Sequence, residues 1–541
     1  CAVLFHENGD AQRLTKELPD LPGMIRSEGY AIIVVLPGSD AVSLRDLDAM
    51  LRPLGLFVYR DNAITADGGP TVTNGFIATV VRDTYDPLRH ARAFEILTQI
   101  PESMQQDPSI AAQIATNKIV CTLAWDSKEG EKDRLARFFY SQVTFYDAVY
   151  VAPLAHEPYL CHAEFWKRIG DDSMRARLIR SALHVAPESV RQKVEIPGAV
   201  PEPNRKTFAS PEWRAPQQLP RVLFIMHPRP HYGLDVQFYG LCEVLGDENV
   251  VAFPFKPTLH GEKPGELAHY PCMFDRKGRP FVLDEVLRQL ESGMFDVIIY
   301  GDIETHVDEQ SMKAIRAAAG DTPIVLFDAQ DDPLDQWEKF DAYIGGGLRM
   351  HFKREMLSCW DYGERCVPMP FAYADRRIPS IGDVVRTTPV FWAGHRQFAL
   401  RRLYLEQIEA KHGLDLRRSY TQEEYALALG NSRIGLNIFG FGFDTVRYWE
   451  IPAHGAMLLA ERLPIDIPHN FVDGESAVFF DDLPDIEQKL AYYMEHLDEA
   501  AAIAARGHTH FMKYHTASAR ARQMLGWMQS RLFEGDPKWK V

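Results

Sequence analysis

The stretch IGLNIFGFGFDTVRYWEIPAHGAMLLAE, Ile434–Glu461, decides how the C-terminal part of this chain folds. Its first residues are apolar and predict a strand, and a loop that contains Gly440 and Gly442 follows. A helix is expected to begin near Asp444 or Thr445, and a second apolar strand closes the stretch. Glycines let a ligand approach the backbone, while the free N–H groups and the dipole of a helix start favour an anion. The stretch therefore predicts a seat for a phosphate.

Two charged residues lie on the expected helix. Arg447 and Glu450 are one turn apart, so they share a face. A carboxylate one to two turns into such a helix can accept hydrogen bonds from ribose hydroxyls, which favours a nucleoside diphosphate as the ligand. A surface ion pair is the alternative for this spacing. The glycine loop before the pair and the turn at His454–Gly455 after it favour the binding site.

The composition is that of a globular protein and excludes several classes. The chain has 541 residues, 46% hydrophobic and 25% charged, which predicts three or four domains. A formal net charge of −16 argues against a protein that binds nucleic acid through a basic surface. No apolar run reaches the roughly 18–20 residues that span a bilayer, so we expect no transmembrane segment.

The cysteines indicate a reducing compartment. All 7 are scattered without a Cys-x-x-Cys pair, which predicts neither a disulfide framework nor a zinc site. A cytoplasmic location is therefore expected. The chain begins at Cys1 without an initiator Met or a signal-like segment, and we expect the true N-terminus to lie upstream.

Patterning divides the chain into five parts. Residues 196–220 are rich in proline, which prevents a helix or a central strand and predicts an extended linker. Before the linker, residues 1–82 predict a small α/β segment, and residues 85–195 predict amphipathic helices. After it, two runs of alternating strands and helices, 221–375 and 376–541, predict two doubly wound α/β domains that face a cleft. The elements expected in these runs include strands at 342–344 and 415–418, and helices at about 484–505 and 516–533.

Two segments before the linker carry resemblances of their own. The order helix, glycine turn, strand, helix and PLGLFVYRD in residues 1–82 resembles the C-terminal half of a class I S-adenosylmethionine methyltransferase. This resemblance implies an antiparallel pair of last strands, but no glycine-rich cofactor loop is present, so methyl transfer by this segment is not expected. The pieces YDPLRHARAFEILTQIP and FWKRIGDDSMRARLIRSALHVAP resemble tetratricopeptide-type (TPR-like) units. They imply a helical array that binds a peptide or partner, and a packing spacer is the alternative.

Several motifs near the C-terminus occur in combination. They are VFWAGHRQFALRRLYL (390–405), YTQEEYALALGNSRIGLNI (420–438), RYWEIPAHGAMLLAE (447–461), FVDGESAVFFDDLPDIEQKL (471–490) and HTHFMKYHTASARARQML (508–525). Together they resemble the spore-maturation (CgeB-like) glycosyltransferases, and more broadly the group 1-type enzymes of GT-B architecture. The resemblance covers about residues 220–535. It implies an acceptor-side domain at 221–375 and a domain at 376–541 that holds a nucleotide sugar.

The resemblance implies a role for each donor-site candidate. Glu450 would accept from the ribose hydroxyls, and Arg447 would face the diphosphate or support Glu450. Gly394 would let the diphosphate approach, cationic side chains after it would neutralise the leaving group, and Tyr420 would contact the base. The full set of candidates is Gly394, His395, Arg396, Arg401, Tyr420, Gly440, Gly442, Thr445, Arg447 and Glu450, with possible help from Lys353 and Arg354.

One expected contact is absent from this sequence. Many GT-B enzymes carry a second acidic residue seven or eight positions before the ribose-binding glutamate. Those positions are Phe443 and Gly442 here. The resemblance therefore supports the diphosphate part of the site better than the part that holds the sugar.

Loops after strands of the first run carry candidate catalytic residues. His227 and His231 are candidate bases, since an imidazole titrates near neutral pH, and structural loop histidines are the alternative. Asp302, Asp328 and Asp331 also follow strands and are candidates for a base or for contacts to acceptor hydroxyls.

The leading hypothesis is a bacterial, metal-independent glycosyltransferase. It would move a sugar from a nucleotide-diphosphate sugar to a hydroxyl of a protein or surface glycan that the helical region would present, with no cofactor besides the donor substrate. The alternatives are a noncatalytic scaffold or binding protein, and a bifunctional methyltransferase–glycosyltransferase with its other half upstream. The sequence leaves open the donor sugar, the nucleotide, the acceptor, the stereochemical outcome and the oligomeric state.

Overall fold

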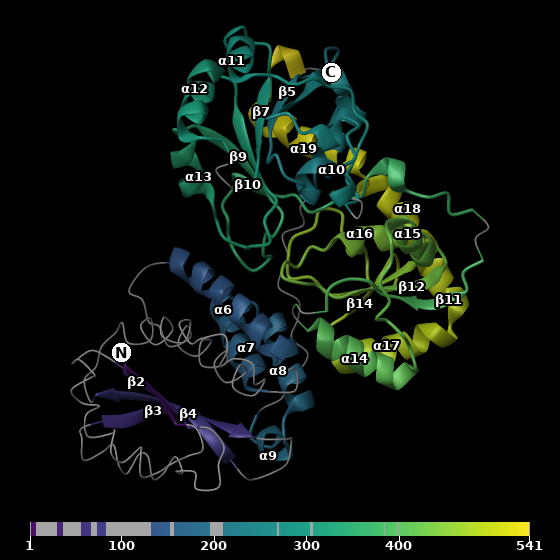
Figure 1. The fold of residues 1–541 in the computed structure, drawn as a ribbon. Helices are drawn as coiled ribbons and strands as arrows, with labels where there is room; N and C mark the ends of the chain where they lie inside the picture. Colours follow the sequence, from purple (N-terminus) through teal and green to yellow (C-terminus); the bar gives the residue numbers. More distant parts are fainter. Residues whose placement is uncertain are drawn as a thin grey trace. The chain divides into compact units, whose positions relative to one another are not determined.

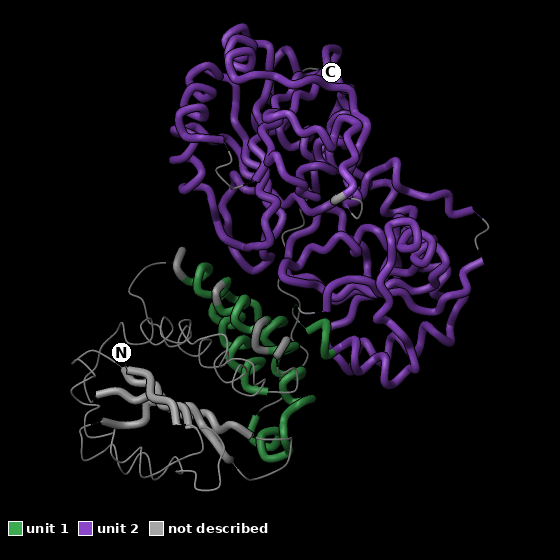
Figure 2. Tube along the Cα trace, in the orientation of Figure 1, with its two compact units in different colours: residues 1–201, 397–403 green, residues 202–396, 404–541 purple. Residues whose placement is uncertain are grey.

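The computed structural model describes residues 2–6, 30–35, 56–65, 73–82, 131–151, 156–194, 209–267, 270–302, 307–382, 385–396, 398 and 400–539. The chain divides into two compact units, one of residues 1–201 with 397–403, and one of residues 202–396 with 404–541 (Figure 1, Figure 2). The helices expected before residue 131 lie outside the described residues.

The first unit contains a four-stranded sheet. Its strands are β1 (Ala2–His6), β2 (Tyr30–Val35), β3 (Leu56–Thr65) and β4 (Thr73–Arg82). The spatial order is β1-β2-β4-β3, with β1 parallel to β2 and β4 antiparallel to both of its neighbours. The antiparallel pair expected for the last two strands is therefore present.

Helices follow the sheet in the same unit. They are α6 (Glu131–Val151), α7 (Glu157–Ile169), α8 (Asp172–Val185) and α9 (Glu188–Arg191). The turn between α7 and α8 is made by Gly170, whose φ is 97°, and by Asp171, whose carboxylate accepts a hydrogen bond from Met174 N at 2.8 Å. A left-handed glycine and an acidic N-cap end one helix and begin the next. The TPR-like character of this region stays a prediction.

The second unit begins with a six-stranded sheet. Its strands are β5 (Val222–Ile225), β6 (Val250–Phe253), β7 (Val297–Gly301), β8 (Ile324–Asp328), β9 (Leu348–Lys353) and β10 (Cys366–Pro368). All are parallel, in the order β10-β9-β8-β7-β5-β6. The helices between them are α10 (Tyr232–Leu245), α11 (Leu283–Glu291), α12 (Glu309–Ala319) and α13 (Trp337–Tyr343), with short 3-10 helices η5 (Asp247–Asn249), η6 (Pro257–Leu259), η7 (Gly265–Leu267) and η8 (Asp375–Arg377).

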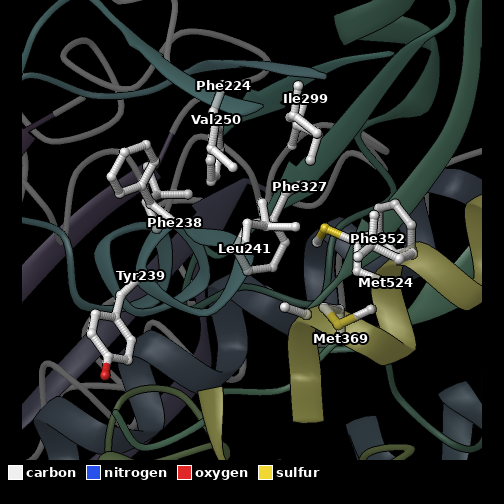
Figure 3. Packing of buried hydrophobic residues seen from close by; sticks show 14 of the residues in the cluster. Phe224, Phe238, Tyr239, Leu241, Val250, Ile299, Phe327, Phe352, Met369 and Met524 are labelled. Atoms are coloured by element: carbon white, nitrogen blue, oxygen red, sulfur yellow. The ribbon is translucent and has the colours of Figure 1, made fainter. Parts of the chain in front are cut away.

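Both faces of this first sheet are buried, as a parallel sheet requires. Successive residues of β5 alternate between the faces, so that Phe224 packs with α10 on one face while Leu223 and Ile225 pack on the other with α11, α12 and α13. Figure 3 shows the first of these two cores, where Phe327 and Phe352 lie near Met524 of the C-terminal helix. The sheet is thus fixed from both sides, and its strand ends can hold loops in place.

A second parallel sheet, of four strands, follows. Its strands are β11 (Thr388–Phe391), β12 (Ser432–Asn437), β13 (Met457–Glu461) and β14 (Val478–Phe480), in that spatial order. The helices of this part are α14 (Arg401–His412), α15 (Gln422–Gly430), α16 (Val446–Ala453), α17 (Leu483–Glu495), α18 (Leu497–Tyr514) and α19 (Ala517–Leu532), followed by η9 (Pro537–Trp539). The two α/β runs expected from the sequence are both present.

The last long helix belongs with the first sheet, although its residues were expected in the second domain. Ala517 N donates to Tyr373 O at 2.8 Å where α19 begins, and Met524 lies in the core that α10 covers (Figure 1). A Cβ atom at Gly240 of α10 would approach Ala517 O to less than 3.0 Å. Glycine is required at position 240 because the two helices pack with their backbones in contact.

Three expected elements differ from the structure. Residues 342–344 end helix α13 instead of forming a strand, because Phe340 and Ile344 are one helical turn apart and both pack into the core. No strand forms at 415–418, and the residues expected as one helix at 484–505 form α17 and α18, separated at His496. The described part of the linker, 209–220, has no helix or strand, as its prolines predict.

Candidate functional site

The start of helix α16 is an uncapped helix N-terminus, as the sequence predicted for an anion seat. Thr445 is its N-cap residue, but the Thr445 hydroxyl donates to Asn437 Oδ1 at 2.5 Å and makes no hydrogen bond to the first turn. Asn437 ends β12, is fully buried, and its Nδ2 has no hydrogen-bond partner among the described residues. Tyr448 N donates to Thr445 O at 3.1 Å, so the N–H groups of Val446 and Arg447 are the ones that an acceptor from outside the helix could bind.

Arg447 lies in this first turn, and part of its guanidinium makes no hydrogen bond within the described residues. Nη1 donates to Ala393 O at 2.7 Å, and the guanidinium carbon lies 4.1 Å from the centre of the Trp392 ring. Nε and Nη2 are shielded from solvent and have no hydrogen-bond partner in the described part of the chain. Burial lowers the pKa of Arg447, although an arginine keeps its charge at neutral pH. Two oriented donors on a buried cation are suited to an anionic oxygen.

Gly394 lies directly against Arg447. Its φ is 145°, a conformation that a side chain disfavours, and a Cβ atom there would approach Arg447 Nη1 to less than 3.0 Å. The sequence expected this glycine to let the diphosphate approach. The structure shows that it first of all makes room for the guanidinium of Arg447.

Glu450 lies one turn further along α16 and is 8% exposed. The Tyr425 hydroxyl donates to its Oε2 at 2.6 Å, and burial raises the pKa of the Glu450 carboxyl. Tyr425 comes from α15, so the two helices together orient the carboxylate. The sequence did not indicate Tyr425, because its partner lies 25 residues away.

Aromatic rings stand at the edge next to Glu450. Tyr420 has its ring centre 5.6 Å from that of Phe391 and 6.5 Å from that of Tyr425, and the Arg418 guanidinium lies 5.1 Å above the Tyr420 ring. The structure thus brings Tyr420 into one cluster with the residue that holds Glu450. A flat aromatic surface of this kind can stack with a planar base.

The glycine loop before α16 holds a carboxylate of the protein itself. Glu355, just after β9, accepts hydrogen bonds from Phe443 N at 2.9 Å and Asp444 N at 3.0 Å. Gly440 N donates to Gly442 O, so it too is engaged. The sequence placed the diphosphate over the whole segment 440–445. In the structure the amides of Phe443 and Asp444 bind Glu355, whereas the start of α16 has no side-chain cap.

The cationic candidates after Gly394 are placed differently from Arg447. Arg396 makes a two-pronged ion pair with Glu409, at 3.0 and 2.8 Å, and this pairing satisfies its guanidinium within the protein. Arg401 begins α14 and is 6% exposed. Lys353, expected near the phosphate, is instead buried in a pair with Asp328, 2.8 Å away. Among these cations, Arg447 is the one that the structure places beside Glu450.

On the first sheet, the structure brings two catalytic candidates together. His231 Nε2 lies 3.3 Å from Asp302 Oδ2, and Leu234 N donates to His231 Nδ1 over a long 3.5 Å. Gln330 Nε2 donates to the other oxygen of Asp302. Asp302 follows β7 with a φ of 78°, a strained backbone for a residue with a side chain. Strain of this kind often accompanies functional sites.

The remaining candidates of this sheet have local partners. His227 accepts a hydrogen bond from Arg229 N at 3.0 Å, which makes a turn in its own loop. Asp328 is fully buried, and its pairing with Lys353 and His351 holds its pKa below the usual range.

Neither a metal-binding cluster nor a membrane-spanning helix occurs among the described residues. In that part of the chain no group of three or more His, Cys, Asp or Glu side chains is arranged to hold a metal ion. No helix within the described ranges has the length and apolar character needed to cross a bilayer.

Parts of this chain are similar to known proteins. Residues 394–526 match a family of glycosyl transferase-like domains. No curated protein matches the chain. Among solved structures, the chain is similar to Anabaena HepE in complex with UDP and glucose (10% identity, 57% of this chain and 100% of that one, TM-score 0.37). It is also similar to a Rickettsia africae glycosyltransferase (10%, 58% and 99%, 0.39) and to sucrose-phosphate synthase from Thermosynechococcus elongatus (10%, 59% and 100%, 0.37).

The matched residues include most of the donor-site candidates. They begin at Gly394 and contain Arg447 and Glu450, the residues that the structure places together at α16. The second unit also has the two parallel α/β sheets that GT-B architecture requires. Residues 394–526 are therefore similar to a glycosyl transferase-like domain, in agreement with the glycosyltransferase class expected from the sequence.

Proposed function

We propose that this enzyme transfers a sugar from a nucleoside diphosphate sugar to an acceptor hydroxyl. One observation carries the proposal: at the start of α16, one turn before Glu450, Arg447 has two solvent-shielded donors that lack a hydrogen-bond partner among the described residues. A cation and a helix dipole suit a diphosphate, and a carboxylate one turn away suits the two hydroxyls of a ribose. Tyr420 supports this orientation because it offers a ring to the base on the side of Tyr425.

The proposed transfer uses groups from both sheets. His231, oriented by Asp302, takes the proton of the acceptor hydroxyl at Nδ1, whose contact to Leu234 N is long enough for the acceptor to replace. The acceptor oxygen bonds to the anomeric carbon while the bond from that carbon to the diphosphate breaks. The electron pair leaves with the diphosphate, and Arg447 with the start of α16 stabilises the charge.

The proposal also covers the metal requirement, the acceptor, the subfamily and the location of the enzyme. The transfer is metal-independent, since Arg447 neutralises the leaving group, and the acceptor is a protein or surface glycan that the TPR-like helices present. The subfamily is CgeB-like, and the enzyme acts in the bacterial cytoplasm. Sugar transfer that continues in EDTA supports metal independence. If EDTA abolishes transfer and added Mg²⁺ or Mn²⁺ restores it, metal independence is overturned.

The experiment is a ligand screen followed by two substitutions. UDP, GDP and ADP, their glucose and mannose conjugates, and S-adenosylmethionine are tested for thermal stabilisation, since a ligand stabilises the state that it binds. We expect one nucleotide family to raise the melting temperature of the wild type. Glu450→Gln and Arg447→Gln should then lose the shift, while the control Glu423→Gln, on the exposed face of α15, should keep it.

A noncatalytic binding module is the second candidate, and one observation favours it. The loop amides of Phe443 and Asp444 are occupied by Glu355. If the wild type neither binds nor hydrolyses any nucleotide sugar of the panel, the noncatalytic alternative replaces the proposal. A thermal shift with S-adenosylmethionine would instead support the bifunctional alternative.

A further inference from the structure

The direction of α16 fixes where the donor's sugar must lie, given the proposed function. Glu450 is one turn inside the helix, and Arg447 is in its first turn. If the ribose binds at Glu450 and the diphosphate binds at Arg447, the ligand runs toward the N-terminus of α16, a helix that rises about 1.5 Å per residue. The sugar is attached to the far phosphate. It therefore reaches the loop that precedes the helix, Gly442–Asp444.

Positions 442 and 443 of this loop lack the acidic side chain that many GT-B enzymes have there, but carboxylates from other loops lie next to Gly442. A Cβ atom at Gly442 would lie 2.5 Å from Asp331 Oδ1 and 2.7 Å from Glu355 Oε1. Both carboxylates come from loops that follow strands of the first sheet. A larger side chain at position 442 would therefore have to displace one or both of these carboxylates.

Of the three carboxylates at this loop, one remains able to bind a ligand. Glu355 is 1% exposed and its two oxygens accept the amides of the loop. Asp444 is 2% exposed and accepts from Phe371 N at 2.5 Å and Trp449 Nε1 at 2.8 Å. The Asp331 side chain is 53% exposed, and Arg354 Nη2 donates to its Oδ1.

Arg354 fixes the position of Asp331. It is buried, its guanidinium lies 4.1 Å from the centre of the Phe371 ring, and it donates to Asp444 O at 3.1 Å as well as to Asp331. One oxygen of Asp331 is thereby held beside Gly442, and the other remains an acceptor. A carboxylate that is already oriented loses little freedom when it binds a hydroxyl.

Gln330, the residue before Asp331, connects this loop to the proposed base. Gln330 donates through its side chain to Asp302, the partner of His231. Asp331 therefore stands between the acceptor side and the start of α16, where the anomeric carbon has to meet the acceptor hydroxyl.

We propose that Asp331 accepts hydrogen bonds from hydroxyls of the donor sugar and so determines which sugar is transferred, replacing from the first sheet the acidic contact missing at 442–443. This assignment rests on the proposed function. It implies a donor whose sugar carries free hydroxyls at the place that Asp331 faces, so a matching deoxysugar nucleotide should be a poor donor.

The test separates the sugar from the nucleotide. Affinities of the wild type and Asp331→Asn are measured by calorimetry for the nucleotide sugar that stabilises the wild type most in the panel, and for its nucleoside diphosphate. Loss of a hydrogen bond to a charged group should weaken binding of the nucleotide sugar by about tenfold or more, with the diphosphate unchanged. Asp321→Asn, an exposed change before the other end of β8, is the matched control and should alter neither affinity.

The other outcomes are distinct. If Asp331→Asn leaves the affinity of the nucleotide sugar unchanged but lowers transfer, Asp331 serves the acceptor or acts as the base, and the assignment is overturned. If both affinities fall together, the substitution acts on the nucleotide seat, which also overturns it. Absence of binding of every panel member by the wild type contradicts the proposed function itself. Melting temperatures of both variants check that each is folded.

Discussion

Replacing Gly394 with alanine tests whether the pocket around Arg447 is built as described. The new Cβ would approach Arg447 Nη1 to less than 3.0 Å, so the guanidinium has to leave its place over Trp392 and its bond to Ala393 O. A stacked cation of this kind contributes about 1 kcal/mol and a hydrogen bond from a charged group about 2 kcal/mol. The backbone adds about 1–3 kcal/mol, because a φ of 145° is unfavourable for alanine.

We therefore expect Gly394→Ala to lower the free energy of unfolding by roughly 2–4 kcal/mol, since part of each contribution is recovered by rearrangement. Denaturant unfolding measures this value. Calorimetry with the best-binding nucleoside diphosphate should show at least a tenfold loss of affinity, because Arg447 no longer points its donors at the start of α16.

Gly413→Ala is the matched control. Its φ of 63° is also positive, but no atom lies within 4 Å of the added Cβ. This change should cost about 1 kcal/mol through the backbone alone and leave the affinity unchanged. Equal stability losses for the two variants, with wild-type affinity for both, would show that Arg447 is not held by Gly394 and does not bind the diphosphate.

Three further predictions concern other contacts. Burial raises the pKa of Glu355 from 4.5 to about 7. The contribution of this carboxyl to stability is therefore complete below pH 4.5 and is lost as the pH rises through 7, a difference of about 3 kcal/mol. Glu355→Gln should remove this pH dependence from the free energy of unfolding measured at pH 4.5 and pH 8. Parallel pH curves for variant and wild type would contradict it. Tyr425→Phe removes the hydrogen bond to Glu450 and should weaken nucleotide binding by about tenfold in calorimetry, with unchanged affinity as the contrary result. Gly240→Ala should lower the free energy of unfolding by about 1–3 kcal/mol, since its Cβ meets the backbone at Ala517, and an unchanged denaturation midpoint would refute close helix packing there.

The sequence predicted the local elements of the proposed donor site better than the contacts around them. Arg447 and Glu450 follow a strand and a glycine loop in a local order that periodicity reveals, and α16 begins at Val446 directly after the expected Thr445. The glycine loop was interpreted as an open anion seat. Nothing local to the loop could show that Glu355, 88 residues away, already fills it.

Alternation of strands and helices, the Pro-rich linker and the one-turn spacing of Arg447 and Glu450 follow from the sequence alone, because each depends on residues within one or two turns of one another. The tertiary structure decided what these elements meet: the return of α19 to the first sheet, the pairing of His231 with Asp302, and the place of Asp331 beside Gly442. Such contacts depend on the packing of buried faces across long separations, which a local pattern does not specify. The local order of residues thus determined the elements of the proposed nucleotide site, and the packing of the two sheets determined which acidic groups surround it.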